Sequence, residues 1–162
     1  YGCSAGGAMT AQATSLIQNQ GLASPGAIGI FGSGAVNFTS GDSSYVAAYI
    51  DGSFPPPAGE GEDRANMTRG YFSGADMNDS IISPALHPEV LARFPPTLIT
   101  TGSRAADMSP AIVTKSKLIK AGVSSTLIVG EGMGHCFQYF PNYPEAQDVY
   151  DATVSFFYAN LK

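Results

Sequence analysis

The sequence predicts an α/β protein built on a mostly parallel sheet that is flanked by helices. Three short apolar and β-branched runs have the length of buried strands, and helical patterns alternate with them along the chain. Parallel strands need long crossover connections, so this alternation favours one parallel sheet. The chain has 162 residues, of which 44% are hydrophobic, and it is long enough to form one domain with a core.

The expected elements follow one another in a simple order. The expected strands span residues 27–31, 97–101 and 125–129. The expected helices span residues 7–21, 109–122 and 144–161, with shorter ones at 43–50 and 64–72. Gly21 and Gly122 stand where helices often end on a glycine. Ser109-Pro110 predicts an N-cap followed by proline at the first helical position.

Residues 40–75 differ in composition and pattern from the rest of the chain. Three prolines at 55–57 interrupt a short helical pattern, and the acidic, glycine-containing stretch 59–63 follows them. Two interpretations stay open for this excursion from the sheet. It forms part of a lid or cap over a site, or it is a plain surface loop.

Charge and composition argue against several classes of partner. The net charge is −5, and the eight lysines and arginines are scattered, so we expect no nucleic-acid partner. No apolar run approaches the ~20 residues of a membrane span. Two cysteines and two histidines indicate no metal, and we expect no cofactor. The cytoplasm is the expected location, and secretion stays open because a leader can lie upstream of Tyr1.

The chain opens on Tyr1-Gly-Cys-Ser-Ala-Gly-Gly7, which contains the Gly-x-Ser-x-Gly spacing of a nucleophile elbow. In such an elbow the serine, here Ser4, sits on a sharp turn between a strand and a helix. A side chain at Gly2 or Gly6 is expected to collide with neighbouring backbone there. The motif alone is a weak signal because glycine and serine are common in this chain. A helical pattern follows it as required, but the expected preceding strand is missing.

A nucleophilic serine needs a histidine to accept its proton, and an acid to orient that histidine. In open parallel sheets such groups gather beyond the carboxyl ends of the strands. His135 lies in a glycine-rich loop after the strand at 125–129, and is the expected base. His87 lies in a proline-bounded turn, and we expect it to be structural.

The expected acid is Asp107, which follows the strand at 97–101. Two alternatives stay open. Asp107 caps the helix that begins at Ser109 instead, or the acid is Asp76, Asp79 or absent altogether.

Several ordered stretches together resemble the hormone-sensitive-lipase-like esterase family of α/β-hydrolases. The matching stretches are Gly-Cys-Ser-Ala-Gly-Gly at 2–7, Ser-Pro at 83–84, and residues 94–104, 118–122 and 131–137. The resemblance implies an α/β-hydrolase in which residues 1–162 form the C-terminal portion of one catalytic domain, lacking its N-terminal strands. It also implies that Ser4 and His135 act in ester hydrolysis, in the order Ser, acid, His.

The chain departs from the family pattern at two positions. Cys3 replaces the aspartate before the nucleophile, and Ala105 stands where the family acid normally follows the Gly-x-Arg step. Asp107 is the nearest carboxylate in the same loop. The family's His-Gly-Gly-type oxyanion motif lies upstream of this chain, so the amide of Ala5 is the oxyanion donor that remains.

Two groups of residues beside the expected pair have structural alternatives. Cys3 and Cys136 flank the serine and the histidine, and we expect free, packed thiols in preference to a disulfide. Four aromatic residues, Phe137, Tyr139, Phe140 and Tyr143, either line an acyl pocket or pack in the core.

The leading functional prediction is a serine carboxylic-ester hydrolase that works through an acyl-enzyme on small or medium acyl esters. A peptidase or amidase on the same fold is the alternative within enzymes. A hydrolase-fold binding protein that has lost catalysis and an inactive proteolytic fragment are alternatives of other kinds. The expected partners are the ester, the upstream half of the protein (also as a separate chain), and further copies in a homo-oligomer.

Overall fold

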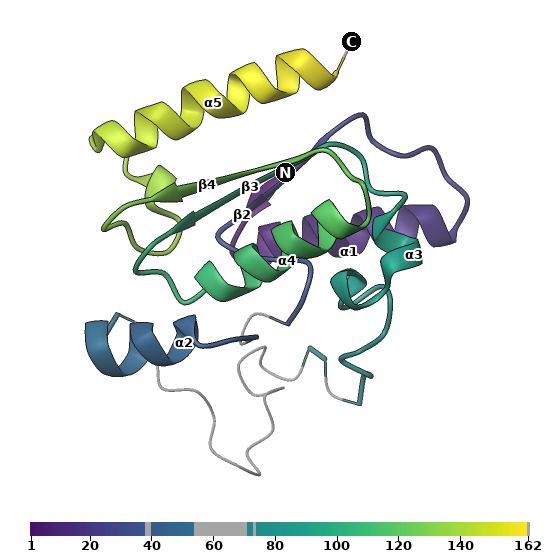
Figure 1. Ribbon diagram of the computed structural model, residues 1–162, viewed down its shortest axis with the longest axis horizontal. Coiled ribbons are helices and arrows are strands. Elements are labelled where there is room, and N and C mark those ends of the chain that lie inside the picture. The colour runs from purple at the N-terminus through teal and green to yellow at the C-terminus, as the bar shows by residue number, and fades with distance from the viewer. Residues whose placement is uncertain (38–39, 54–70, 73, 162) are drawn as a thin grey trace.

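A four-stranded parallel sheet forms the centre of the computed structural model, which describes residues 1–37, 40–53, 71–72 and 74–161 (Figure 1). Its order is β1-β2-β3-β4. The strands are β1 (Gly2–Cys3), β2 (Ile28–Phe31), β3 (Thr97–Gly102) and β4 (Ser125–Gly130). The predicted parallel sheet is therefore confirmed.

The register of the sheet aligns the ends of its strands. Cys3 is paired with Phe31, and Phe31 with Thr100, so β1, β2 and β3 end close to one another. Gly102 and Gly130 are paired where β3 and β4 end. Since all strands are parallel, the loops after β1, β3 and β4 emerge at the same edge of the sheet. That edge carries the predicted serine, acid and histidine.

Helices cover both faces of the sheet (Figure 1). On one side lie α1 (Ala5–Asn19), α3 (Pro88–Leu91) and α4 (Met108–Lys120), and on the other lies α5 (Pro144–Asn160). Successive strand residues point to opposite faces, so Ile99 joins the core beneath α1 and α4 while Leu98 joins the smaller core that includes Phe156 of α5.

The observed boundaries differ from the predicted ones in informative ways. The first helix begins at Ala5, directly after the serine, and the next long helix begins at Met108. Gly2–Cys3 pairs with β2, so the end of the strand before the elbow lies within the chain, contrary to the expectation. Sequence patterns missed α3 and the 3-10 turn at Pro84–Leu86, because helices this short carry no clear period.

The excursion at 40–75 is described only in part. Its first helix, α2 (Ser43–Tyr45), continues as a π-helical turn over Val46–Asp51. This pair of turns replaces the single helix that was predicted over 43–50. The proline run, the acidic stretch and nearly all of the predicted helix at 64–72 lie outside the described residues.

Candidate active site

Ser4 occupies a sharp turn between β1 and α1. Its backbone has φ 60° and ψ −125°, in a region that residues with side chains seldom adopt. The Ser4 amide donates a hydrogen bond of 2.9 Å to the carbonyl of Phe31, which fastens the turn to the end of β2. This is the geometry of a nucleophile elbow.

The glycines around Ser4 match the expectation at Gly2 and differ from it at Gly6. A Cβ at Gly2 would lie 2.6 Å from the carbonyl carbon of Gly6, so the predicted collision at Gly2 is confirmed. A Cβ at Gly6 would meet nothing within 4 Å, and the collision expected there is wrong. Instead Gly7 is close-packed, because a Cβ there would lie 2.5 Å from the carbonyl oxygen of Phe31. Gly7 is crowded because the start of α1 packs closely against the end of β2.

The structure brings together the three side chains predicted to form the site. His135 Nε2 lies 2.9 Å from Ser4 Oγ, and His135 Nδ1 lies 2.5 Å from Asp107 Oδ1. A carboxylate accepts hydrogen bonds, so Nδ1 carries the proton and Nε2 is left to accept from the serine hydroxyl. The Asp107 side chain is fully buried, and that of His135 is 32% exposed. The imidazole therefore bridges a buried charge and an accessible hydroxyl.

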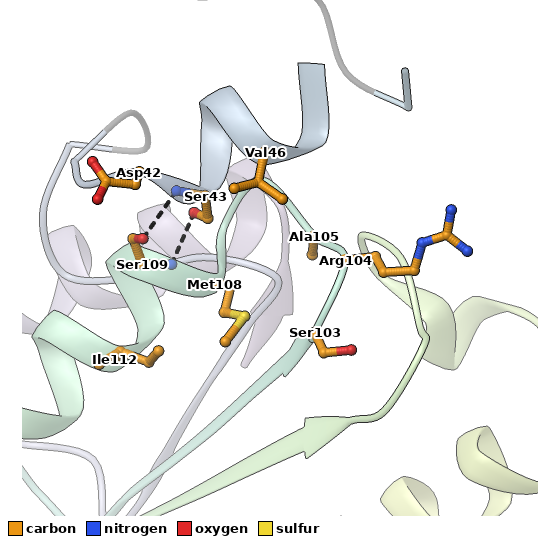
Figure 2. Close-up of a pocket in the computed structure, with 9 residues that line it drawn as sticks. All are labelled: Asp42, Ser43, Val46, Ser103, Arg104, Ala105, Met108, Ser109 and Ile112. Atoms are coloured by element: carbon orange, nitrogen blue, oxygen red, sulfur yellow. Dashed lines mark hydrogen bonds between the residues drawn. The ribbon is translucent and has the colours of Figure 1, made fainter. Parts of the chain in front are cut away.

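The Asp107 carboxylate does not cap α4, although Asp107 is the N-cap residue of that helix. Its second oxygen, Oδ2, accepts a hydrogen bond of 2.6 Å from Thr101 Oγ1. Ser43 caps the helix in its place (Figure 2). The Ser109 amide donates to Ser43 Oγ at 2.9 Å, and the Ser43 amide donates to Ser109 Oγ at 3.1 Å. This reciprocal cap leaves the carboxylate available to His135.

The other carboxylates that were considered make local contacts. Asp76 Oδ1 accepts from the Asn78 amide at 2.9 Å, and Asp79 Oδ1 accepts from the Ile81 amide at 2.8 Å. These are bonds within exposed turns. His87 places Nε2 2.7 Å from the Asn78 carbonyl oxygen, in keeping with the structural role expected for it.

Ala5 is the first residue of α1. The first amides of a helix have no carbonyl partner within the helix, and they carry partial positive charge. The Ala5 amide follows Ser4 directly and lies at the positive end of α1.

Two hydrogen bonds join the loop that carries His135 (residues 131–136, the histidine loop) to the loop that carries Asp107 (residues 103–107). The Arg104 amide donates to the Met133 carbonyl at 3.0 Å, and the Gly132 amide donates to Ser103 Oγ at 2.8 Å. A Cβ at Gly102 would collide with the Met133 carbonyl, so glycine is required where the two loops meet. These contacts fix the position of the His135 loop relative to the loop that carries Asp107.

Cys3 and Cys136 form a disulfide, with their Cα atoms 6.3 Å apart, and the expectation of free thiols is wrong. Two turns explain the pairing. Ser4, next to Cys3, has φ 60°, and Cys136 has φ 51°. Each turn changes the direction of the chain beside a cysteine, so the sulfurs meet next to Ser4 and His135. The motif predicts the turn at Ser4, but no pattern in the sequence indicates the one at Cys136.

The four aromatic residues after His135 divide into two groups. Phe137 is 2% exposed and packs against Gly130 at the end of β4. Tyr139, Phe140 and Tyr143 are exposed, and the last two stack with ring centroids 5.5 Å apart. The core interpretation therefore holds for Phe137 alone.

A pocket of about 310 Å³ lies beside the loop of the acid (Figure 2). It is lined by Asp42, Ser43, Val46, Ser103, Arg104, Ala105, Met108, Ser109 and Ile112. An ion pair joins Arg104 to Asp51 of the π-helical turn. The described part of the 40–75 excursion thus packs against the start of α4 and forms one wall of the pocket.

The fold and the elbow place this chain among the α/β-hydrolases. A family model described as alpha/beta hydrolase fold matches residues 1–139, and the chain belongs to that family. Within it, the resemblance to hormone-sensitive-lipase-like esterases is confirmed by similar solved structures. No protein of curated function matches the sequence significantly.

Three solved structures illustrate the similarity. A crystal structure of an esterase has a TM-score of 0.82 at 28% identity, over 98% of this chain and 47% of that one. A hormone-sensitive lipase from a metagenome library has a TM-score of 0.74 at 26% identity, over 91% of this chain and 48% of that one. An esterase/lipase from an uncultured bacterium has a TM-score of 0.72 at 25% identity, over 91% and 47%. The chain spans about half the length of these proteins.

None of the helices within the described residues combines the length and the apolar character that a membrane crossing requires.

Proposed function

We propose that this chain carries the catalytic triad of a serine carboxylic-ester hydrolase. The observation that carries the proposal is the continuous hydrogen-bonded series from Ser4 Oγ through the His135 imidazole to the buried Asp107 carboxylate. Membership of the esterase-like α/β-hydrolases supports it. The expected substrates are small or medium acyl esters.

The first half of the reaction forms an acyl-enzyme. Ser4 Oγ attacks the ester carbonyl while its proton moves to His135 Nε2, and the charge of Asp107 stabilises the imidazolium. The Ala5 amide donates to the developing oxyanion. When the tetrahedral intermediate collapses, His135 returns the proton to the departing alcohol oxygen.

The second half restores the enzyme. Water replaces the alcohol, His135 Nε2 accepts a proton as the water oxygen attacks the acyl carbon, and the ester bond to Ser4 Oγ breaks. The proton then returns to Oγ, and the carboxylic acid leaves. The first and the last proton transfers of this cycle pass between Ser4 Oγ and His135 Nε2, across their 2.9 Å contact, and the other two use the same nitrogen.

In this proposal Asp107 replaces the acid that the family places at the position of Ala105. Ala105 is buried and lines the pocket beside the loop, whereas Asp107 reaches the imidazole. The same loop therefore supplies the acid from a different position. The reciprocal cap between Ser43 and Ser109 supports the assignment, since it relieves Asp107 of capping α4.

We further propose that residues 1–162 are the C-terminal portion of one catalytic domain. The similar esterases are about twice as long as this chain, and the family's second oxyanion donor comes from a segment upstream of the elbow. We assign the described start of the 40–75 excursion to the wall of the substrate site, because Ser43 and Val46 line the pocket next to the loop that carries Asp107.

The disulfide favours an oxidising compartment over the cytoplasm that the cysteine count suggested. Disulfides persist in secreted proteins and are rare in reducing compartments. The bridge joins Cys3 to Cys136 within the site itself. We therefore propose secretion, which cell fractionation of the natural producer would test.

The test of the function is a pair of variants of the complete polypeptide, Ser4→Ala and His135→Ala. Each is expected to lower kcat on a short-chain ester by about 10³-fold or more, with an unchanged unfolding temperature. A serine-directed fluorophosphonate should label the parent at Ser4. Ser116→Ala, at an exposed position on α4, is the matched control. Turnover within tenfold of the parent in either variant would refute the assigned roles.

A further inference from the structure

The disulfide joins the two residues that adjoin the proposed catalytic pair. Cys3 immediately precedes Ser4, and Cys136 immediately follows His135. The bridge closes a sequence separation of 133 residues, and the hydrogen bond beside it spans 131. One covalent link therefore lies beside the hydrogen bond through which Ser4 would pass its proton to His135.

The two partners of His135 are held by different means. On the side of the acid, the Arg104 amide donates to the Met133 carbonyl and the Gly132 amide donates to Ser103 Oγ, which joins the histidine loop to the loop that carries Asp107. On the side of the serine, the sulfur of Cys3 receives both the covalent bond and a contact of 3.0 Å from Gln138 Nε2. The distance between serine and histidine thus depends on the bridge in a way that the distance between histidine and acid does not.

The sheet attaches the elbow to β2. The pairing of β1 with β2 ends at Cys3 and Phe31, and the Ser4 amide donates to the Phe31 carbonyl. The disulfide adds a covalent link from the elbow to the segment that carries His135.

The surroundings are shaped to accommodate the bridge. Cys3 and Cys136 are 9% and 6% exposed. Gly32, at the end of β2, has φ 55°, and a Cβ there would lie 2.7 Å from Cys136 Sγ, 2.9 Å from Cys3 Sγ and 3.2 Å from His135 Cε1. A glycine backbone therefore makes room at once for both sulfurs and for the imidazole.

We propose that the Cys3–Cys136 disulfide is a positioning element of the active site, which holds His135 Nε2 within hydrogen-bond distance of Ser4 Oγ. The inference rests on the proposed function of that pair. Cys3 acts through its neighbour Ser4, and Cys136 Sγ lies 3.6 Å from His135 Nε2, so the bridge contributes position and takes no part in the proton transfers. A misplacement of about 1 Å between reacting groups lowers a rate by up to about 10²-fold. Opening the bridge should therefore lower kcat and leave KM unchanged.

The bridge can be opened chemically in the complete polypeptide. A dithiothreitol thiolate attacks one cysteine sulfur, forms a mixed disulfide with it and releases the other cysteine as a thiolate. The second dithiothreitol thiol then attacks the dithiothreitol sulfur of this mixed disulfide and releases the first cysteine. The products are two protein thiols and cyclic oxidised dithiothreitol. Peptide masses before and after reduction report whether the peptides of Cys3 and Cys136 are linked. Reoxidation restores the bridge and serves as the rescue.

Three variants complete the experiment: Cys3→Ala, Cys136→Ala and the double variant. Each single variant is expected to lower kcat about 10- to 100-fold, with KM within twofold of the parent. Because the bridge is lost as a unit, the double variant should be no slower than either single variant. The double variant is also the matched control for reduction, since dithiothreitol should slow the parent and leave the double variant unaffected. Assays are run well below the unfolding temperature of each variant.

The outcomes separate this inference from the proposed function. Linked peptides in the parent, together with a kcat within twofold after reduction, would overturn the inference while the function stands. Unlinked cysteines in the oxidised parent would overturn it as well. If the parent hydrolyses no ester but its Ser4 reacts with a fluorophosphonate, a 10- to 100-fold slower reaction after reduction supports the inference without the function. A parent that neither hydrolyses esters nor reacts with the probe would overturn both.

Discussion

Replacing Asp107 by asparagine preserves the size of a fully buried side chain, but it removes the charge and adds an amide group. The wild-type carboxylate uses one oxygen for His135 Nδ1 and the other for Thr101 Oγ1. In the variant, one of these two positions must receive the amide nitrogen. The substitution therefore perturbs both the charge and the tautomer of His135.

The loss of charge alone can be given a magnitude. The centres of charge of an imidazolium and a carboxylate in such a hydrogen bond are about 4 Å apart. At an effective dielectric constant of about 20 the attraction is about 4 kcal/mol. This attraction is present only while His135 is an imidazolium, after it has accepted the proton of Ser4. Losing the attraction therefore slows the reaction by about 10³-fold. A wrong tautomer, with the proton on Nε2, would bring the loss to about 10⁴-fold.

Thr101 determines which of the two limits applies. Its hydroxyl can accept a hydrogen bond as well as donate one, so it can face the new amide nitrogen while the amide oxygen faces His135. Adding Thr101→Val removes that acceptor and turns the nitrogen toward Nδ1. We therefore expect the kcat of Asp107→Asn to be about 10³-fold below that of the parent. The kcat of the double variant, Asp107→Asn with Thr101→Val, should be about 10⁴-fold below it.

The assay is kcat on a short-chain ester per mole of folded protein, with the unfolding temperature measured alongside. Asp76→Asn is the matched control, because the carboxylate of Asp76 bonds within its own exposed turn. An Asp107→Asn variant that is merely less stable, with kcat within tenfold of the parent, would refute the reasoning. Thr101→Val alone should leave most of the activity.

Three further predictions concern the frame of the site. Gly2→Ala should destabilise the protein by about 1–3 kcal/mol through its collision with the Gly6 backbone, while Gly6→Ala is neutral or stabilising; equal unfolding midpoints in denaturant would contradict this contrast. Ser43→Ala should lower the unfolding free energy by about 0.5–2 kcal/mol, because the amide of Ser109 loses its acceptor, and an unchanged denaturant midpoint would exclude that role. Residues 1–162 expressed alone should associate and show no turnover, because β1 is an edge strand of the described sheet and the family's second oxyanion donor lies upstream. Sedimentation velocity with an ester assay tests this, and a soluble, active monomer would sink it.

The order of the elements and the type of sheet could be read from the sequence. Three apolar runs separated by helical periods leave little choice but parallel strands with crossovers. The assignments of Ser4 and His135 also rested on local patterns, because Ser4 stands in a Gly-x-Ser-x-Gly motif followed by a helical period and His135 stands in a glycine-rich loop after a predicted strand. Local pattern is enough when the residue and its element are neighbours in sequence.

The tertiary structure decided which contacts those residues make. The carboxylate of Asp107 reaches His135 because a serine distant in sequence, Ser43, caps α4 in its place. Gly7 is crowded and Gly6 is open because α1 packs against the Phe31 carbonyl of β2. The disulfide between Cys3 and Cys136 depends on the turn at Ser4, which the motif predicts, and on a turn with positive φ at Cys136, which no pattern in the sequence indicates. Each of these outcomes depends on distances between segments far apart in sequence, and only the packed fold sets those distances.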